Sequence, residues 1–187
     1  MKFTRRSRVV VREPTEQDAH GIAQVLVESW LAAYAGLLPD ELLAGMSVTD
    51  RQQQLERAFA APTPPGAVRL VGEQHGAIIG FANAGMVPLI DGAVDAPAEP
   101  RRAAELAVLY VAPTHWRQGV GRKLLRRVMR RLAVEDCTDV SAWVVDGNES
   151  AFAFFESQGW TRATGERREV MDGHLVPQAQ IAIELDH

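Results

Sequence analysis

The sequence contains a single cysteine, Cys137, so the chain cannot form an intramolecular disulfide bond. No cysteines and histidines have the spacing of a zinc site, and the sequence therefore predicts no bound metal. A thiol can also act as a nucleophile, but this requires a lowered pKa. Cys137 lies between an expected helix and an expected strand, with no histidine close by in the sequence, so we expect a structural residue.

Long apolar segments are also absent. No run approaches the ~20 residues that a helix needs to cross a bilayer. The basic start, MKFTRRSRVVVREP, contains only three valines where a signal peptide has a longer apolar stretch. We therefore expect a cytoplasmic protein without a membrane partner, in which residues 1–7 form a basic tail.

The chain has little net charge, because 20 basic and 24 acidic residues give −4 with the histidines neutral. This balance argues against a nucleic-acid partner, since nucleic-acid-binding domains are normally basic. The basic residues are concentrated at 2–12 and 117–131, and the acidic ones at 91–99 and 135–139. A local basic patch on an acidic protein favours a small anionic ligand over a polyanion.

The pattern of apolar residues predicts one domain over residues 1–187 with a mixed α/β fold on a single sheet. Strands are expected at 8–12, in two runs of 67–86 joined by a hairpin turn at EQHG, at 105–113, at 139–146, and on both sides of Asp172-Gly173. Helices are expected at 15–36, 36–43, 49–60, 119–134 and 149–158. Residues 87–103, rich in proline, glycine and acids, are expected to form a long mobile loop.

A G-x-G sequence follows the most apolar strand and opens a helix, in PTHWRQGVGR at 113–122. The unpaired N–H groups and the dipole of a helix N-terminus favour an anion, and glycine lets phosphate oxygens approach the backbone. The alternative is a tight strand-to-helix turn that requires small residues. Other phosphate motifs are excluded, because residue 124 is leucine instead of the third glycine of G-x-G-x-x-G and no P-loop sequence occurs.

Two motifs in order resemble those of the GNAT family of acetyl-CoA-dependent N-acetyltransferases. The first is ELAVLYVAPTHWRQGVGRKLL at 105–125, where the family has a strand that runs into [QR]-x-x-G-x-[GA]. The second is NESAFAFFESQGW at 148–160, where the family has N-x-x-A-x-x-F-Y-E-x-x-G-[FW]. The resemblance implies a mostly antiparallel sheet of six to seven strands with helices on both faces, in which two strands part to hold the cofactor.

The resemblance also implies which residues bind acetyl-CoA. Backbone groups of Leu109, Tyr110 and Val111 would pair with the pantetheine arm, as an added strand does. The pyrophosphate would be bound by the N–H groups of Gln118, Gly119, Val120, Gly121 and Arg122, with added charge from Arg117. Asn148 would hydrogen-bond the cofactor, although it is equally well placed as the N-cap of the following helix.

The sequence departs from the family pattern at two positions. Trp116 stands where the family has Gln or Arg, with Arg117 one residue later. Phe155, a cofactor-site position, stands where the family has the tyrosine that protonates the departing thiolate. Phenylalanine has no proton to give, so another acid or water would have to serve, or the thiolate leaves without help.

Acetyl transfer to an amine requires a neutral acceptor, since an aliphatic ammonium titrates near pH ~10. Glu105 is the candidate base, because its strand could place the carboxylate beside the thioester, directly or through water. The alternative is a solvent-facing glutamate or one paired with Arg101 or Arg102. A backbone N–H near Val111 would polarise the carbonyl group.

Trp30 and Tyr34 lie on one face of the first helical segment, which lines the acceptor pocket in the family, although an aromatic stripe is also typical of a core.

The expected activity is acetyl transfer from acetyl-CoA to a primary amine of a small molecule, protein or peptide. The alternative is a non-catalytic CoA-binding sensor or partner module of the same fold. A homodimer is common in the family. The acidic residues Asp91, Asp95 and Glu99 favour a cationic acceptor.

Overall fold

The computed structural model describes residues 8–87, 102–171 and 173–185. In these ranges one seven-stranded sheet has the order β1-β2-β3-β4-β5-β7-β6. Its strands are β1 (Val10–Arg12), β2 (Val68–Gln74), β3 (Ala77–Met86), β4 (Ala103–Val111), β5 (Asp139–Val145), β6 (Thr161–Met171) and β7 (His174–Glu184). All neighbouring strands are antiparallel except β4 and β5. The mixed, mostly antiparallel sheet expected from the sequence is confirmed.

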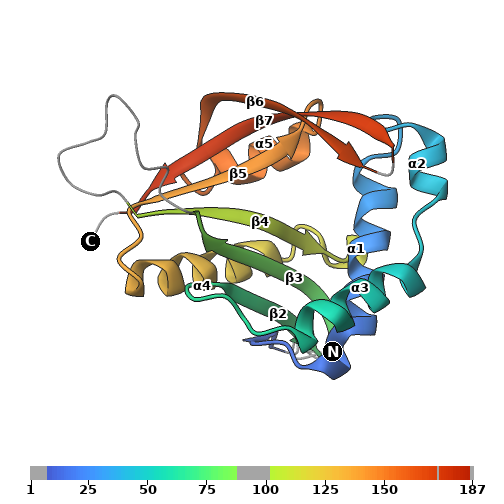
Figure 1. Ribbon diagram of the computed structural model, residues 1–187, viewed down its shortest axis with the longest axis horizontal. Helices are drawn as coiled ribbons and strands as arrows, with labels where there is room; N and C mark the ends of the chain where they lie inside the picture. The colour runs from blue at the N-terminus through green and yellow to red at the C-terminus, as the bar shows by residue number, and fades with distance from the viewer. Residues whose placement is uncertain (1–7, 88–101, 172, 186–187) are drawn as a thin grey trace, which may run out of the picture.

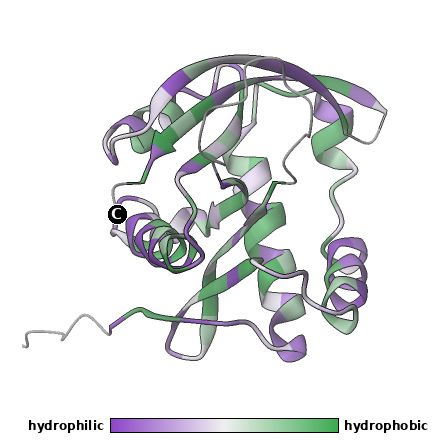
Figure 2. Ribbon diagram, turned by 60° about the vertical axis from the view of Figure 1, so that its left-hand side comes forward, coloured by the Kyte–Doolittle hydropathy of each residue, from purple (hydrophilic) through white to green (hydrophobic). Residues whose placement is uncertain are grey.

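Helices cover both faces of this sheet, as expected (Figure 1). They are α1 (Ala19–Ala33), α2 (Asp40–Ala44), α3 (Val48–Ala60), α4 (Val120–Val134) and α5 (Glu149–Glu156). The apolar side chains of α4 and α5 pack in one cluster with Ile79, Leu106 and Val140. Those of α1 and α3 pack with Val71 and Phe81 on the other face. Helix α3 is mostly hydrophilic, whereas α1 is largely apolar (Figure 2), and no helix among the described residues is long and apolar enough to span a membrane.

Both hairpins predicted from turn residues are present. His75 and Gly76 have φ angles of 54° and 79° between the paired residues Gln74 and Ala77, as a two-residue turn with two left-handed positions requires. Met171 pairs with His174, and Gly173 has a φ of 83°. Tight turns therefore determine the pairing of β2 with β3 and of β6 with β7.

Some boundaries differ from the sequence-based expectation. Strand β4 begins at Ala103, which was expected in the loop, because the pairing with β3 continues to a hydrogen bond from Val87 N to Ala103 O at 2.8 Å. Most of the loop that was expected to be mobile, residues 88–101, lies outside the described ranges. It includes the acidic residues Asp91, Asp95 and Glu99. The basic tail, residues 1–7, also lies outside them.

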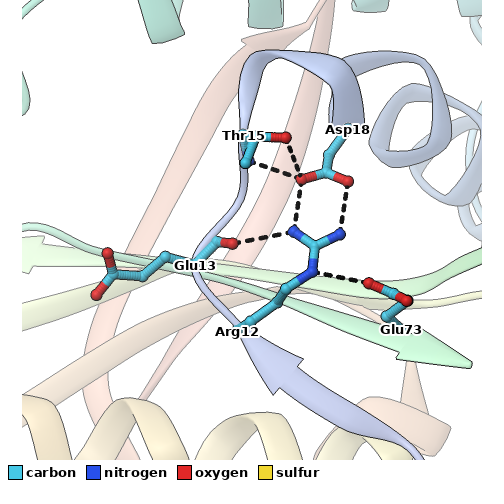
Figure 3. A network of polar contacts seen from close by, with 5 residues as sticks. All are labelled: Arg12, Glu13, Thr15, Asp18 and Glu73. Atoms are coloured by element: carbon cyan, nitrogen blue, oxygen red, sulfur yellow. Dashed lines mark hydrogen bonds and ion pairs between the residues drawn. The ribbon is translucent and has the colours of Figure 1, made fainter. Parts of the chain in front are cut away.

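The start of the first helix is held by an ionic network (Figure 3). Residues 16–18 form a 3-10 turn before α1, so the α-helix begins four residues later than Thr15. The Asp18 carboxylate accepts hydrogen bonds from Thr15 N at 2.7 Å and from the two Nη atoms of Arg12 at 2.7 and 2.8 Å. Arg12 Nε also donates to Glu73 at 2.7 Å. The bonds from Arg12 lower the pKa of Asp18 to about 2 against the opposing effect of burial.

Candidate active site

The central strands β4 and β5 pair only at one end. Their parallel pairing covers Ala103↔Asp139, Ala104↔Val140 and Glu105↔Ser141. Beyond these residues β4 stays with β3 and β5 stays with β7, so the two strands diverge (Figure 1). The predicted parting of two strands is therefore confirmed, and it begins directly after Glu105.

A β-bulge in β4 changes which groups face the gap. Ala84 pairs with Leu106 and Asn83 with Val108, so Ala107 is the extra residue. Leu106 and Leu109, three residues apart, consequently both pack on the face of the sheet that α4 covers. No sequence signal indicated the bulge, because the strand is apolar in both phases.

Past the bulge, the backbone groups of β4 alternate between β3 and the gap. Ala112 N donates to Ile79 O at 2.9 Å, so Ala112 forms a hydrogen-bonded pair with β3. Because antiparallel pairing alternates, the backbone groups of Tyr110 also face β3, and those of Leu109 and Val111 face the gap. Leu109 and Val111 thus direct backbone groups toward the gap, whereas Tyr110 contributes its side chain on the face of α1.

The carbonyl group at the end of β4 is held by two side chains, one from α1 that the sequence analysis did not single out and one from the glycine loop. Val111 O accepts hydrogen bonds from Ser29 Oγ at 2.9 Å and from Trp116 Nε1 at 2.6 Å. These bonds attach α1 and the glycine loop to the same strand end. Trp116, the departure from the family pattern, therefore fixes the loop through its indole N–H instead of a Gln or Arg side chain.

The glycine loop has the backbone of an anion site. Arg117 and Gly119 have left-handed φ angles of 58° and 83°, and Gly119 is the N-cap of α4. The N–H groups of the first helical turn have no acceptor within the helix, and Arg117, Gln118 and Arg122 are exposed around them. Gly121 is close to α5, since a Cβ there would lie 3.4 Å from the Phe154 ring. The two glycines therefore satisfy the tight turn and leave the helix N-terminus open, so the turn interpretation holds and the phosphate site stays a prediction.

Asn148 and Phe155 lie where β5 leads into α5. Asn148 is buried and its Oδ1 accepts from Ala151 N at 3.1 Å, which makes it the N-cap of α5. Phe155 is 8% exposed, and its ring contacts those of Phe154 and Trp160 at centroid distances of 5.2 and 5.1 Å. The position of the expected tyrosine thus has an aromatic environment and no hydroxyl group.

Trp30 and Tyr34 are packed in a buried cluster at the end of α1. Their rings are edge-to-face with centroids 5.1 Å apart, and Leu42, Val145 and Tyr110 belong to the same cluster. Tyr34 hydrogen-bonds the side chains of Tyr110 and Asn148, so it connects the two diverging strands. Burial raises the pKa of both tyrosines, which keeps their hydroxyl groups protonated.

Glu105 lies at the point where the strands part. Its Oε2 accepts a hydrogen bond from Trp143 Nε1 at 3.2 Å. Of the two arginines considered as partners of Glu105, Arg102 has its Nη1 atom 3.9 Å from Asp136 Oδ2, and Arg101 is outside the described ranges. The Glu105 carboxylate is therefore half-buried beside an indole, with one oxygen held and the other available.

Two other kinds of reactive centre, a nucleophilic cysteine and a metal site, find no support in the described residues. Cys137 is fully buried, and burial raises the pKa of its thiol, which is the opposite of what a nucleophile needs. The described part of the chain contains no group of three or more His, Cys, Asp or Glu side chains arranged for a metal ion. The gap between β4 and β5 remains the site to which the sequence motifs and the fold both point.

Comparison with known proteins identifies the family. A family model described as "Acetyltransferase (GNAT) family" matches residues 20–160. The chain belongs to this family. The resemblance inferred from the two motifs is thereby confirmed, and the protein is an N-acetyltransferase by family.

The relatives agree with this assignment over most of their length. An uncharacterized N-acetyltransferase of Bacillus subtilis, YuaI, is 25% identical over 167 residues, covering 87% of this chain and 86% of the relative. The structure of the PaiA N-acetyltransferase from Thermoplasma acidophilum in complex with coenzyme A superimposes with a TM-score of 0.69 at 18% identity, covering 95% and 99% of the two chains. YncA of Salmonella typhimurium with its cofactor acetyl-CoA gives a TM-score of 0.66 at 22% identity, with 97% and 96% covered. At these identities the structural matches establish the shared fold.

Proposed function

We propose that this protein transfers the acetyl group of acetyl-CoA to a primary amine, and that the cofactor binds in the gap between β4 and β5. One observation carries the proposal. The unpaired edge of β4 after Glu105 leads directly into a helix N-terminus with exposed N–H groups. A pantetheine amide chain and a pyrophosphate need those two features in that order.

The residues present fit such a group. Leu109 offers a backbone donor and acceptor for the arm, and Val111 offers its N–H, since its carbonyl group is held by Ser29 and Trp116. The N–H groups of Gln118, Gly119, Val120, Gly121 and Arg122, with the side chains of Arg117 and Arg122, form a donor set for phosphate oxygens. Asn148 and Phe155 line the side of β5 and α5, where Asn148 keeps one amide donor after capping α5 with its oxygen.

The chemistry requires that a proton leaves the acceptor ammonium before the amine attacks. Glu105 is the proposed base, since its free oxygen can accept that proton directly or through water. The N–H of Val111 faces the gap and is the proposed donor to the carbonyl oxygen on which charge develops. When bound, the cofactor supplies an activated acetyl thioester. Trp30 and Tyr34, buried behind Tyr110, are proposed to shape the acceptor side of the pocket.

The first prediction tests the cofactor site by isothermal titration with acetyl-CoA. Arg122→Gln removes a charge-assisted contact to phosphate and should raise the Kd about three- to tenfold, since 1.4 kcal/mol corresponds to tenfold. Arg126→Gln is the matched control, because Arg126 is also exposed on α4 but one turn further from its N-terminus. If folded wild-type protein does not bind acetyl-CoA, the proposal fails.

The acceptor is proposed to be a cationic amine of a small molecule or of a peptide. On strand β6, Arg167 and Glu169 pair with each other at 3.0 Å, and the Glu105 carboxylate beside the gap would attract a cationic acceptor. A panel of amines screened for thiol release with acetyl-CoA identifies the acceptor. The cytoplasmic location and the homodimer remain predictions.

A second candidate is a CoA-binding sensor without turnover. Phe155 favours it, because this position provides no acid for the departing thiolate. Thiol release in the amine panel separates the two candidates, since turnover with any acceptor excludes a pure sensor.

A further inference from the structure

A connected set of side chains continues from Glu105 across three further strands. Trp143 of β5 donates its indole N–H to Glu105. The guanidinium of Arg167 on β6 lies over the Trp143 ring, 4.5 Å from its centroid. Arg167 is itself held by Gln178 Oε1 at 2.8 Å and by Glu169 Oε2 at 3.0 Å. Gln178 Nε2 closes the set with a bond to Glu169 at 3.1 Å.

The sheet register explains why these side chains meet. Glu105 pairs with Ser141, so Trp143, two residues later on β5, has its side chain on the same face as Ser141. Trp143 pairs with Gln180 of β7, and Gln178 is again two residues away. Gln178 pairs with Arg167 of β6. All five side chains of the network therefore belong to one face of the sheet, across the opening between β4 and β5, since Glu169 is two residues after Arg167 on β6.

We infer that Trp143 and Arg167 are positioning residues that hold the Glu105 carboxylate in one orientation. This inference rests on the proposed role of Glu105 as the base. The indole N–H occupies Oε2, so the proton of the acceptor amine or of a water goes to Oε1. Arg167 restricts the Trp143 ring through a cation–π contact, and its bonds to Gln178 and Glu169 fix the guanidinium. Gln178 is 4% exposed, so the far end of the network is anchored in the protein interior.

Fixing the orientation of the Glu105 carboxylate would favour proton transfer from the acceptor amine. A glutamate at a strand end where the neighbouring strand departs lacks the packing that limits its rotamers, and each misplaced rotamer removes the base from the reacting amine. Holding one oxygen costs no catalytic capacity, since a carboxylate has further lone pairs for the proton.

The kinetic test is a double-mutant cycle with an acceptor from the amine panel. Trp143→Phe keeps the ring but loses the N–H, and should lower kcat about three- to tenfold, whereas Glu105→Gln should lower it by about 100-fold or more. The double variant should be no slower than Glu105→Gln alone, because Trp143 acts only through Glu105. The KM and Kd for acetyl-CoA should not change.

Arg167→Gln and a matched control extend the cycle. Arg167→Gln should lower kcat less than Trp143→Phe, again without a further loss in the Glu105→Gln background. Arg162→Gln is the control, because Arg162 is also on β6 with its guanidinium over an aromatic ring, that of Phe152 at 3.8 Å, but in contact with α5. It should leave kcat unchanged. Additive losses in the cycle would assign Trp143 a structural role and overturn the inference, as would a loss at Arg167→Gln confined to the acceptor KM.

A spectroscopic test needs no turnover. The chain has four tryptophans, so the indole N–H signals of protein labelled with 15N-tryptophan can be assigned by Trp→Phe variants. The Trp143 signal should shift in Glu105→Gln and in Arg167→Gln, and stay in place in Arg162→Gln. If the Trp143 indole N–H signal does not shift in Glu105→Gln, the inference is wrong. If acetyl-CoA is not bound or no amine is acetylated, the proposed function fails instead, and this measurement still decides whether the two residues hold the carboxylate.

Discussion

At the scale of single residues, the aromatic side chains of the site differ in whether they donate a hydrogen bond. Trp116 and Trp143 use their indole N–H groups to hold a carbonyl oxygen and a carboxylate, at 2.6 and 3.2 Å. Phe155 donates nothing, although it occupies the position where the family has a hydroxyl group. Of the two tyrosines of the chain, Tyr34 is buried and Tyr110 is partly buried, and both belong to the cluster at the end of α1. Proton supply to the leaving thiolate is therefore the weakest part of the residue set.

Restoring that hydroxyl group is the prediction at this scale. Phe155→Tyr should raise kcat about tenfold, which lies below the 10²–10⁴-fold that a well-placed general acid contributes. The aromatic environment will limit the gain, because a buried hydroxyl without a partner costs about 1–3 kcal/mol of stability. Phe154→Tyr, one residue earlier on α5, is the control and should leave kcat unchanged. An unaltered kcat in Phe155→Tyr would show that water or another group already protonates the thiolate.

At the scale of elements, the junction of β1 and α1 positions the helix that we propose to line the acceptor side of the site. Arg12 on β1 ties Asp18 before α1 to Glu73 on β2, as Figure 3 shows. From there α1 runs to Ser29, which bonds the end of β4, and to Tyr34, which connects β4 to α5. The ionic network thus fixes one end of a helix whose other end forms part of the site.

This network predicts a dependence of stability on pH. The pKa of Asp18 is lowered from 3.8 to about 2, so its stabilising effect is fully present above pH 3.8 and is lost as the pH falls toward 2. Asp18→Asn should lower the free energy of unfolding at neutral pH by about 1–2 kcal/mol, discounted because the Arg12 side chain is partly exposed. Between pH 4 and 2 the variant should then lose less stability than wild type.

Urea denaturation at a series of pH values measures both effects. Asp40→Asn, at an exposed aspartate in the first turn of α2, is the control and should follow wild type over this range. Identical pH profiles for Asp18→Asn and wild type would show that the carboxylate contributes nothing to folding.

At the scale of the whole molecule, the sheet consists of two parts joined by a short parallel pairing. Strands β1 to β4 form one part and β5, β7 and β6 the other, and they share only three residue pairs. Beyond these three pairs, β4 directs the backbone groups of Leu109 and the N–H of Val111 toward the gap. A ligand that hydrogen-bonds this edge completes the sheet, so binding should change the protection of a few backbone groups more than the overall fold.

Hydrogen exchange at residue resolution tests this view. Without ligand, the amides of Leu109 and Val111 should exchange faster than those of Val108 and Tyr110, which bond to β3. Acetyl-CoA at ~100 times its Kd should stabilise the native state by about 2.7 kcal/mol and slow Leu109 and Val111 in particular. The β2–β3 hairpin around Gly76 is an internal reference that should respond only to the overall stabilisation. Equal slowing along all of β4 would contradict binding at the exposed edge.

Much of the architecture could be predicted from the sequence, because local chemistry determines it. Gly76 and Gly173 accommodate the left-handed backbone that tight turns require, and these residues predicted both hairpins correctly. The apolar stripe of Leu124, Val128 and Leu132 predicted the buried face of α4. The order of the two family motifs predicted a cofactor gap, since each motif lies within one continuous segment.

Only the tertiary structure brought together the residues that interact across strands. The pairing of Glu105 with Trp143, and of Trp143 with Arg167, depends on the strand order β4-β5-β7-β6, which no local pattern encodes. The bulge at Ala107 could not be predicted from the sequence either. Strand β4 is apolar in both phases of the alternation, and the extra residue changes only the register of its pairing with β3. The sequence by itself therefore determined the elements, the turns and the helix N-terminus that we propose for the phosphate groups. The fold decided what surrounds the carboxylate, because contacts between distant segments arise only when the sheet is assembled.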